Sequence, residues 1–478
     1  MSELSERADA APISIFALGR DAATYAFGGL AYKGIALLSV PVLARLLSPT
    51  QLGLLDLAAV VATLIGLVAV WGTDQGVALL EPTKEHGSGV WEAAAALVAT
   101  AAIALALACV VLQQPLAVFL TGDSANRSVI AAAGVYGGVM AASAFALNTV
   151  RLRATSRAYA IASFLIVVCE MAFALAVAWL IPQPVAWMVL AWAGGASLIT
   201  VPVLVRYLPR LRRPRGVTVR RLMGFGAPLI PAAMAWLIGD VWVRSTLARA
   251  AGLAELGEYG VAYRIASVLG LAVTGFGVAW YPYLYRSAAT AVGPRTVAAG
   301  TAALLALAAG AVTLTGLAPE LVAVVAGPEY AGATVAVPAL AGGIIGLGGF
   351  VLMSAVVGRS GSTRRIGAAA LFGMAAQVAI ATALVPTLGQ EGAAFASLGG
   401  YGLAAIGLAA TEVRVLARNG GVRLAVAIVI GAVGLAIAAQ LGPLTLAARL
   451  AFVLIYCGLA AGLAWALVPK SRGRLESE

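Results

Sequence analysis

Long runs of apolar residues constrain this chain more than any other feature of its sequence. Residues 93–112 and 424–441 are two examples, each close to the roughly 20 residues that a helix needs to cross a bilayer. Of the 478 residues, 62% are hydrophobic and only 11% are charged, whereas a soluble domain carries about 25% charged residues. A soluble fold of this length cannot bury so much apolar surface, so lipid must surround much of the chain.

Inside a bilayer every backbone polar group must be satisfied by the protein itself, which leaves helices or closed barrels. Barrel strands are short and alternate between apolar and polar residues, but the apolar runs here are continuous. The sequence therefore predicts an all-α polytopic membrane protein with about fourteen transmembrane helices. The expected spans cover residues 15–47, 52–80, 89–112, 128–150, 159–181, 185–207, 222–249, 259–285, 296–317, 331–358, 366–388, 392–417, 422–441 and 444–468.

The distribution of basic residues tests this count of spans. With the N-terminus in the cytoplasm, 24 of the 31 Lys and Arg residues fall in cytoplasmic segments or the adjoining span ends, 3 fall on the other side and 4 lie inside spans. Such a bias is typical of membrane proteins, and it explains the net charge of +11 without a nucleic-acid partner. We expect both termini in the cytoplasm, and a first span that remains as an anchor because no cleavage site follows it.

The sequence also contains an internal repeat at an offset of about 204 residues. Leu43-Ala44-Arg45 aligns with Leu247-Ala248-Arg249, and Leu52-Gly53 aligns with Leu256-Gly257. Each half then holds six spans, so both halves enter the membrane in the same orientation, and two such lobes can rock about a site at the midplane. The expected organisation is a cytoplasmic tail (1–14), an N-lobe (15–207), a basic linker (208–221), a C-lobe (222–417), helices 13 and 14 (418–468) and a cytoplasmic tail (469–478).

Ionisable groups inside spans are costly unless they are paired or hydrated, so they are candidates for function. Five of them lie at similar predicted depth on spans 1, 2, 7 and 8, the pairs related by the repeat: Lys33, Asp56, Asp240, Arg244 and Arg264. We expect them to line a hydrated cavity between the lobes, with the three basic groups contacting substrate and the acids lining the cavity or coupling to an ion.

Less specific interpretations remain open for each of these residues. Asp240 and Arg244 are four residues apart and can form a structural ion pair on one helix, and Lys33 or Arg264 can extend toward the membrane interface. Asp74, deeper in span 2, is a candidate for a cytoplasmic gate or cation site. Glu170 in span 5 has no partner that the sequence identifies.

Several motifs of enzymes and metal sites are absent from the sequence. It has no GxxxxGK[ST], GxSxG or HExxH stretch and no Cys/His cluster. A single histidine cannot build a metal site, and the three cysteines all lie in apolar runs, so we expect neither a disulfide nor a cofactor. The chain is predicted to be a transporter and not an enzyme.

The segment after the first span resembles a known family. Leu43-Ala44-Arg45-Leu46-Leu47-Ser48-Pro49-Thr50-Gln51-Leu52-Gly53 is similar to the opening of bacterial polysaccharide-biosynthesis flippases of the Wzx type, in the multidrug/oligosaccharidyl-lipid/polysaccharide exporter superfamily. Ala254-Glu255-Leu256-Gly257-Glu258-Tyr259-Gly260 echoes it at the start of span 8. Fourteen spans, twin lobes and a basic central linker are similar to that family as well.

The resemblance implies a flippase that moves a polyprenyl-pyrophosphate-linked oligosaccharide to the outer leaflet of a bacterial inner membrane. Lys33, Arg264 and Arg244 are then the positions for the basic residues that the family places in a central cavity, while Asp56, Asp240 and Asp74 are the acidic or ion-coupling candidates. A monomer is expected, in contact with membrane lipid and with polysaccharide assembly proteins. Two alternatives stay open, a lipid II flippase and a cation-coupled multidrug exporter. Short outward loops argue against a third, a membrane glycosyl polymerase.

Overall fold

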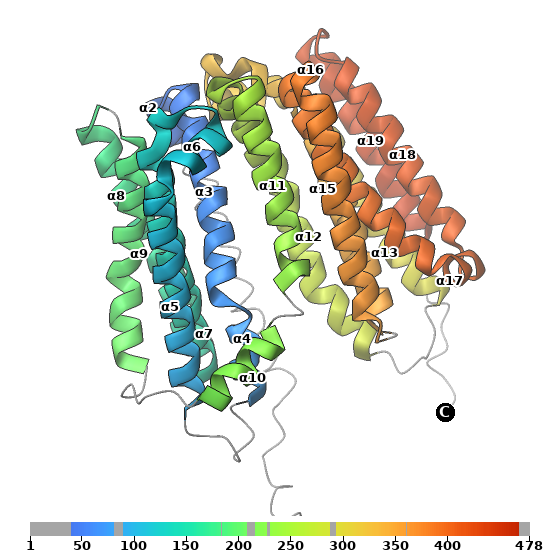
Figure 1. Cartoon of the computed structure of the whole chain (residues 1–478). Helices are drawn as coiled ribbons and strands as arrows, with labels where there is room; N and C mark the ends of the chain where they lie inside the picture. Colours follow the sequence, from blue (N-terminus) through green and yellow to red (C-terminus); the bar gives the residue numbers. More distant parts are fainter. Residues whose placement is uncertain are drawn as a thin grey trace, which may run out of the picture.

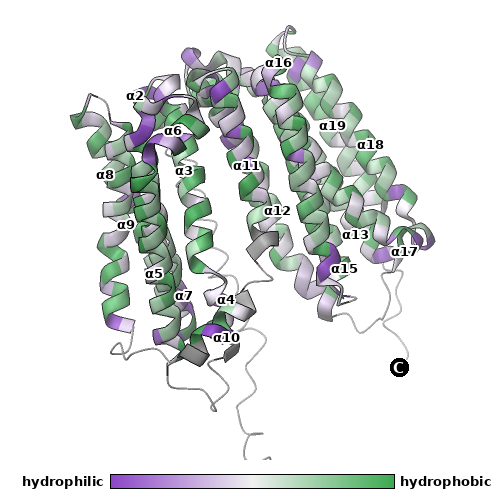
Figure 2. Ribbon diagram, in the orientation of Figure 1, coloured by the Kyte–Doolittle hydropathy of each residue, from purple (hydrophilic) through white to green (hydrophobic). Residues whose placement is uncertain are grey.

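The computed structural model describes residues 40–80, 89–182, 184–207, 216–226, 230–286, 293–359 and 361–467, and in these segments the regular structure is entirely helical. Eleven helices of this part of the chain are long and apolar enough to cross a membrane. Figure 2 shows apolar residues along the lengths of the helices and hydrophilic residues gathered toward their ends. Each helix pairs its backbone N–H and C=O groups by hydrogen bonds within the helix, as a lipid environment requires.

The N-lobe is the group of helices on the left in Figure 1. Its elements are α2 (Val40–Leu46), α3 (Pro49–Val70), α4 (Thr73–Leu80), α5 (Val90–Val111), α6 (Gln113–Thr121), η2 (Ser124–Asn126), α7 (Arg127–Arg153), α8 (Ser156–Leu180) and α9 (Val185–Tyr207).

The second half of the chain forms the C-lobe and two further helices packed on its side (Figure 1). After the linker helix α10 (Gly216–Gly226) come α11 (Ile230–Ala250), α12 (Leu253–Arg286), α13 (Pro294–Gly316), α14 (Ala318–Val325), η3 (Pro328–Val335), α15 (Val337–Arg359), α16 (Thr363–Thr411) and α17 (Val413–Arg418), followed by α18 (Gly421–Gln440) and α19 (Leu446–Leu467).

The fold class predicted from the sequence is confirmed. One of the eleven helices, α16, holds two passes, because Gly389 with φ of 53° breaks it near its middle, at a conformation that suits glycine. Helix α11 has 21 residues and carries Asp240 and Arg244, which make it less apolar than the eleven. Of the first expected span (residues 15–47), the described part of the chain contains only α2, and Lys33 lies outside the described residues.

Two boundaries differ from those expected. The span expected at residues 52–80 is divided, because α3 ends at Val70 and Trp71 (φ 50°) and Gly72 (φ 66°) turn the chain into α4, although Pro49–Ala78 together still form one candidate membrane span. The span expected from Leu222 begins at Ile230 instead. Leu222 belongs to α10, where its side chain is fully buried in an apolar cluster of the N-lobe. Apolar residues on this amphipathic helix produced the longer prediction, because hydropathy alone does not separate a span from an adjoining surface helix.

The segment that carries the family resemblance is a helix start. The Ser48 hydroxyl accepts a hydrogen bond from the Gln51 backbone N–H, and the Gln51 side chain accepts one from the Ser48 N–H. This reciprocal capping box, with Pro49 in the first turn, begins α3 sharply. It fixes where the chain turns back into the membrane, and therefore fixes the position of Asp56 two turns later.

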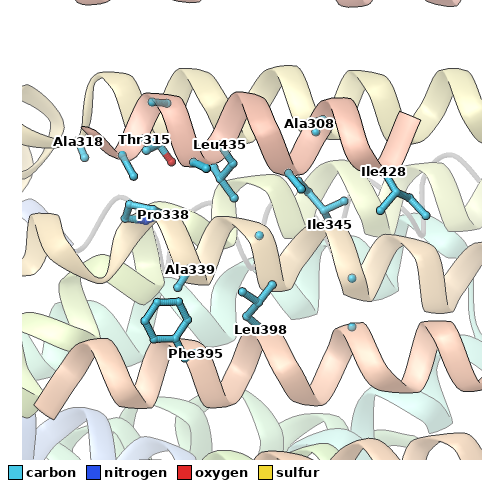
Figure 3. A pocket seen from close by; sticks show the side chains of 18 of the residues that line it. Ala308, Thr315, Ala318, Pro338, Ala339, Ile345, Phe395, Leu398, Ile428 and Leu435 are labelled. Atoms are coloured by element: carbon cyan, nitrogen blue, oxygen red, sulfur yellow. The ribbon is translucent and has the colours of Figure 1, made fainter. Parts of the chain in front are cut away.

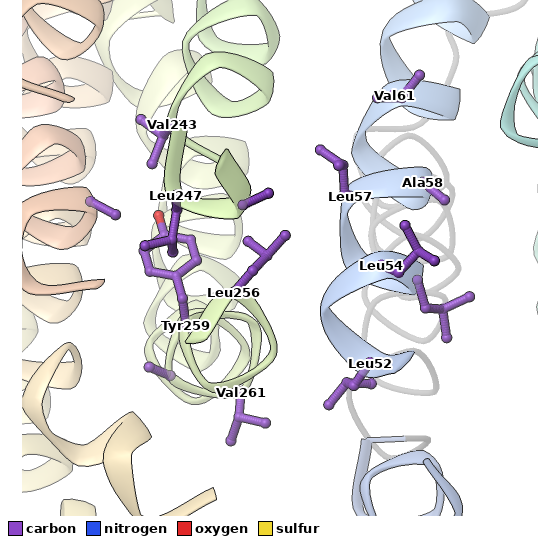
Figure 4. Packing of buried hydrophobic residues seen from close by; sticks show 14 of the residues in the cluster. Leu52, Leu54, Leu57, Ala58, Val61, Val243, Leu247, Leu256, Tyr259 and Val261 are labelled. Atoms are coloured by element: carbon purple, nitrogen blue, oxygen red, sulfur yellow. The ribbon is translucent and has the colours of Figure 1, made fainter. Parts of the chain in front are cut away.

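Among the described residues, the helices of the two lobes pack against each other at one end. There, a single apolar cluster takes residues from both lobes, and Leu57 of α3 and Leu256 of α12 point into the space between their helices (Figure 4). Toward the opposite end each lobe has its own cluster, and α3 and α12 diverge (Figure 1). We call the end that holds residues 47–53 and 250–257 the joined end, and the end that holds α4 and α10 the split end.

Two glycines related by the repeat make the closest approach at the joined end. A Cβ added to Gly53 would collide with the Leu253 carbonyl oxygen, and one added to Gly257 would collide with the Pro49 carbonyl oxygen. Positions 49 and 253 are themselves 204 residues apart. The contact is therefore reciprocal, as expected where a two-fold axis relates the lobes, and only glycine lets the two helices come this near.

Two arginines related by the repeat extend the joined end. Arg45 donates to the Val324 carbonyl oxygen on α14 of the C-lobe (3.0 Å). Arg249 lies over the Phe119 ring on α6 of the N-lobe, with its guanidinium carbon 5.4 Å from the ring centroid. Tyr330 adds a further link, because its hydroxyl donates to the Leu47 carbonyl oxygen (2.8 Å). Thus an arginine of the N-lobe contacts α14 of the C-lobe, and the equivalent arginine of the C-lobe contacts α6 of the N-lobe.

Helices α18 and α19 belong to the C-lobe side. Arg449 on α19 forms an ion pair with Glu320 on α14, and the Tyr456 hydroxyl donates to the Ile430 carbonyl oxygen, which links α19 to α18. Between α18 and helices α13, α15 and α16 lies an apolar cavity with a volume of about 980 Å³ (Figure 3). Leu398, Ile345 and Leu435 are among the residues that line it.

We predict that Gly53→Val and Gly257→Val each loosen the joined end. The added methyl groups force the backbones apart and destabilise the closed contact between the lobes by about 1–3 kcal/mol. A loss of this size increases the fraction of molecules with an exposed interface about tenfold. The measurement is labelling of the purified protein by a water-soluble maleimide at Leu256→Cys in the Gly53 variant and at Leu52→Cys in the Gly257 variant, with the native cysteines removed.

Gly270→Val is the matched control, since a Cβ at Gly270 on the same helix as Gly257 meets no atom within 4 Å. Equal labelling in the control and in the two test variants contradicts the reciprocal contact.

Candidate functional site

Four of the charged residues singled out in the sequence meet at the boundary between the lobes. Asp56 comes from α3 of the N-lobe, while Asp240 and Arg244 come from α11 and Arg264 from α12 of the C-lobe. The Arg244 Nε lies 2.8 Å from Asp56 Oδ2, and the Arg264 NH2 group lies 2.9 Å from Asp56 Oδ1. One carboxylate of one lobe therefore binds two guanidinium groups of the other.

Asp56 and Arg244 are almost completely removed from solvent, with side-chain exposures of 7% and 1%. Removing charges from water is costly, and their attraction offsets the cost only where the geometry is good and the remaining polar atoms are satisfied. Both Asp56 oxygens accept from an arginine. This arrangement keeps the carboxylate ionised and makes it a fixed point between the lobes.

Arg244 is held by more than Asp56. Its guanidinium carbon lies 4.7 Å from the ring centroid of Tyr263 and 5.5 Å from that of Tyr259, within the range of a cation–π interaction. Its NH1 group also donates to the Asp240 carbonyl oxygen (3.4 Å) and is 3.9 Å from the Asp240 carboxylate. Arg244 is therefore a fixed part of the protein interior.

The Asp240 carboxylate has a partner from another helix. Gln377 on α16 donates its Nε2–H to Asp240 Oδ1 (3.2 Å). The Oε1 of the same Gln377 side chain is buried and has no hydrogen-bond partner. The ion pair expected between Asp240 and Arg244 is thus present, but it is the weaker of the two contacts that Arg244 makes with a carboxylate.

Arg264 is the more accessible arginine of the cluster. About a fifth of its side chain is exposed (21%), although its NH1 group is itself buried and has no hydrogen-bond partner. Gly260, one turn earlier on α12, makes room for it: a Cβ there would lie 3.1 Å from Arg264 NH1 and 3.3 Å from Asp56 Cγ. Arg264 therefore has donor capacity left after binding Asp56.

Comparison of the two repeats shows that the lobes contribute different charges to the cluster. Gly260 stands 204 positions after Asp56, so the acid of one lobe faces the glycine that corresponds to it in the other. Arg244 and Arg264 correspond to Val40 and Val60 in the N-lobe. Within the described residues, the N-lobe therefore supplies one negative charge to this site, and the C-lobe supplies two positive charges and one negative.

Two other residues named from the sequence, Asp74 and Glu170, lie apart from this cluster. Asp74 begins α4 near the split end, where its carbonyl oxygen accepts from Asn148 (3.2 Å). The charges of Asp56, Asp240, Arg244 and Arg264 sum to zero, and Lys33, the fifth charged residue named from the sequence, lies outside the described residues. Glu170 is buried in the N-lobe and accepts a hydrogen bond from the Tyr136 hydroxyl (3.1 Å).

Sequence reasoning missed several contributors to the site. Tyr259, Tyr263, Gln377 and Gly260 are uncharged, so a search for ionisable groups within spans does not select them. A usable signal exists for two of them, since Tyr259-Gly260 closes the segment that echoes the start of α3. Chemically, two convergent guanidinium groups form a site for an anion with several oxygen atoms. Among the described residues no three His, Cys, Asp or Glu side chains lie together as a metal site.

Comparison with known proteins identifies the family of the chain. The sequence model of a family described as "Polysaccharide biosynthesis protein" matches residues 18–288, which is more than half of the chain. A comparison with curated protein sequences found no match.

Solved transporter structures share the fold at low sequence identity. The lipid II flippase MurJ in an inward closed conformation is 10% identical, with a TM-score of 0.71 over 92% of this chain and 98% of its own. An outward-facing MATE multidrug transporter of the MOP superfamily is 14% identical, with a TM-score of 0.56 over 83% of this chain and 96% of its own. A MOP superfamily transporter from Pyrococcus furiosus is 15% identical, with a TM-score of 0.52 and the same coverage.

We predict that Arg244→Ala and Asp56→Ala each lower the Tm of the purified protein, because each leaves a buried charge without its main partner, at a cost of about 3–5 kcal/mol. The double variant should lose less than the sum of the two losses, because the pair is removed together. Thermal unfolding in detergent measures all three, with Arg206→Ala at an exposed position as the control. Strict additivity contradicts direct pairing.

Proposed function

Because the chain belongs to the polysaccharide biosynthesis protein family, we propose that it is a flippase that moves a polyprenyl-pyrophosphate-linked oligosaccharide across the membrane by alternating access. The product serves cell-surface polysaccharide assembly. The observation that carries this proposal is the convergence of Arg244 and Arg264 from one lobe on a single carboxylate of the other. A flippase for a pyrophosphate-linked substrate needs such an anion site where its two lobes meet.

The chemistry of the proposed substrate matches this site. A pyrophosphate loses most of its hydration when it enters a membrane protein, so it needs charge-assisted hydrogen bonds in place of water. Arginine presents several N–H donors in a planar fork and stays charged at any physiological pH. Arg264 already has an unpaired NH1 group and partial exposure, so it is the first contact we assign to the pyrophosphate, and Arg244 is the second.

Alternating access follows from the way the lobes meet. They share one apolar cluster at the joined end and have separate clusters elsewhere. We assign the split end to the cytoplasm, in agreement with the distribution of basic residues, so this conformation receives substrate from inside. Opening to the outside then requires the contacts of Gly53, Gly257, Arg45 and Arg249 to separate. During this cycle the sugars occupy the hydrated space between the lobes and the polyprenyl tail remains in lipid.

Two related functions use the same fold. A lipid II flippase would recognise the same pyrophosphate, and the breadth of the likeness to MurJ supports it, since 92% of the chain is covered. A cation-coupled multidrug exporter would depend on the acids, Asp56, Asp240 and Asp74. Asp56 is already bound by two arginines and Asp240 by Gln377, which disfavours a free cation site.

The proposed setting is the bacterial inner membrane, with the protein acting as a monomer beside polysaccharide assembly proteins. The most informative experiment for the substrate is deletion of the gene in its host, followed by analysis of the lipid-linked glycans that accumulate in the inner leaflet. Accumulation of a polyprenyl-pyrophosphate-linked oligosaccharide supports the proposal. Accumulation of lipid II selects the flippase alternative.

We predict that Arg264→Ala and Lys33→Ala each abolish glycan export while the protein still inserts into the membrane. Both changes remove a positive charge that we assign to the pyrophosphate, and Arg264→Lys should restore part of the activity because charge remains without the planar fork. Export is measured by complementation of the deletion strain. Full export by the double Lys33/Arg264 variant rules out the anion site.

Topology provides an independent prediction. Fusion of green fluorescent protein to either terminus should give a fluorescent product, and alkaline phosphatase at the same positions should be inactive, because both termini are expected in the cytoplasm. A fusion at the Gly389 break in α16 should give the reverse result. An active phosphatase at either terminus contradicts the assigned orientation.

A further inference from the structure

The Asp56 carboxylate occupies the position that an anionic ligand would take. Its two oxygens accept from two arginines at 2.8 and 2.9 Å, which is the geometry of a charge-assisted contact with an oxyanion. Asp56 belongs to the N-lobe and both arginines belong to the C-lobe. The contact therefore neutralises the anion site and ties the lobes together at the same time.

The surroundings show why the acid can be exchanged. Gly260 packs directly against the ion pair, and a Cβ there would press on both Arg264 NH1 and Asp56 Cγ, so the pair depends on the absence of a side chain at this position. Arg264 is partly exposed, and its NH1 group is without a partner. A diphosphate has more oxygen atoms than a carboxylate and greater negative charge, so it can engage both arginines together with the free NH1 group. Asp240 stays with Gln377 and need not move.

From these contacts we propose that Asp56 is a displaceable internal ligand: a substrate diphosphate takes its place on Arg244 and Arg264, and its release frees the lobes to separate at the joined end. The proposal rests on the proposed function, because it assumes a phosphate-bearing substrate at this site. It adds the link between binding and movement. Anion binding breaks an ion pair between the lobes, so the loaded protein opens outward more readily than the empty one.

The displacement also makes opening depend on bound substrate. Without substrate, separation of the lobes would leave two buried guanidinium groups with only Asp240 near them, and uncompensated buried charge is costly. With a diphosphate bound, the arginines stay neutralised while Asp56 leaves with the N-lobe. An empty transporter is thereby held closed at the joined end, which prevents futile opening.

The first test uses the purified full-length chain in lipid nanodiscs and inorganic pyrophosphate as the probe. Asp56→Asn keeps the shape of the side chain and removes the competing charge, so it should bind pyrophosphate about tenfold more tightly than the unchanged protein. Adding Arg264→Ala to Asp56→Asn should abolish this gain, which places the probe at the cluster. Calorimetry measures the affinity, and equal or weaker binding by a folded Asp56→Asn protein overturns the proposal.

Glu320→Gln is the matched control. Glu320 is also a carboxylate paired with an arginine, Arg449, but both residues lie on the C-lobe side of the molecule. Its replacement should leave the pyrophosphate affinity unchanged. An equal gain in this control shows that the effect comes from net charge alone, and that outcome also overturns the proposal.

The second test needs no change at Asp56, so it stands even if Asp56→Asn does not fold. Pyrophosphate added to the otherwise native chain with Leu256→Cys should raise maleimide labelling from outside, and added sodium chloride of equal ionic strength should not. Labelling that pyrophosphate leaves unchanged overturns the proposal. Neither test measures glycan export, so normal export by the Arg264→Ala variant contradicts the proposed function separately.

Discussion

The contact of one N-lobe carboxylate with two C-lobe guanidinium groups is the constraint on which the rest of this structure depends. In a site without water, the charged forms of Asp56 and Arg244 are stable only when the two side chains form an ion pair. The packing around them serves this need: two tyrosine rings cover Arg244, and Gly260 leaves room for the acid. Because the partners come from different lobes, the same electrostatic requirement that stabilises the site also sets the relative position of the two halves.

Around this contact the joined end contains two equivalent sets of contacts, which the internal repeat relates. Arg45 and Arg249 each hold the short outer helix of the opposite lobe, and the backbones of Gly53 and Gly257 approach reciprocally. Outside the membrane spans, burial and the nearby Glu329 carboxylate raise the pKa of Tyr330 to about 12, so its hydroxyl keeps the proton that it donates to Leu47. The joined end is consequently insensitive to pH at that link, and the arginines are its charged elements.

Much of this could be predicted from the sequence, and the limits have physical causes. Continuous apolar runs predicted the helices, and the offset of 204 residues aligned Gly53 with Gly257, but their contact is visible only in the structure. Counting residues from span ends put Asp56, Asp240, Arg244 and Arg264 at one height. Counting does not give the rotation of each helix, so the closest partner of Arg244 was found 188 residues away at Asp56, although Asp240 was the expected one. Polar but uncharged residues of the site, such as Gln377, are not found by a search for charged residues.

The pairing of Asp56 with Gly260 bears on how such a protein can arise. In a dimer of identical subunits, a two-fold axis would bring the same residue to both positions. Two aspartates there would repel each other, and two glycines would leave the arginines without an anion. Duplication and fusion of the two halves into one polypeptide lift that restriction, because each copy can then mutate alone. The asymmetric pair of Asp56 and Gly260 is therefore a property that a dimer of identical subunits cannot have.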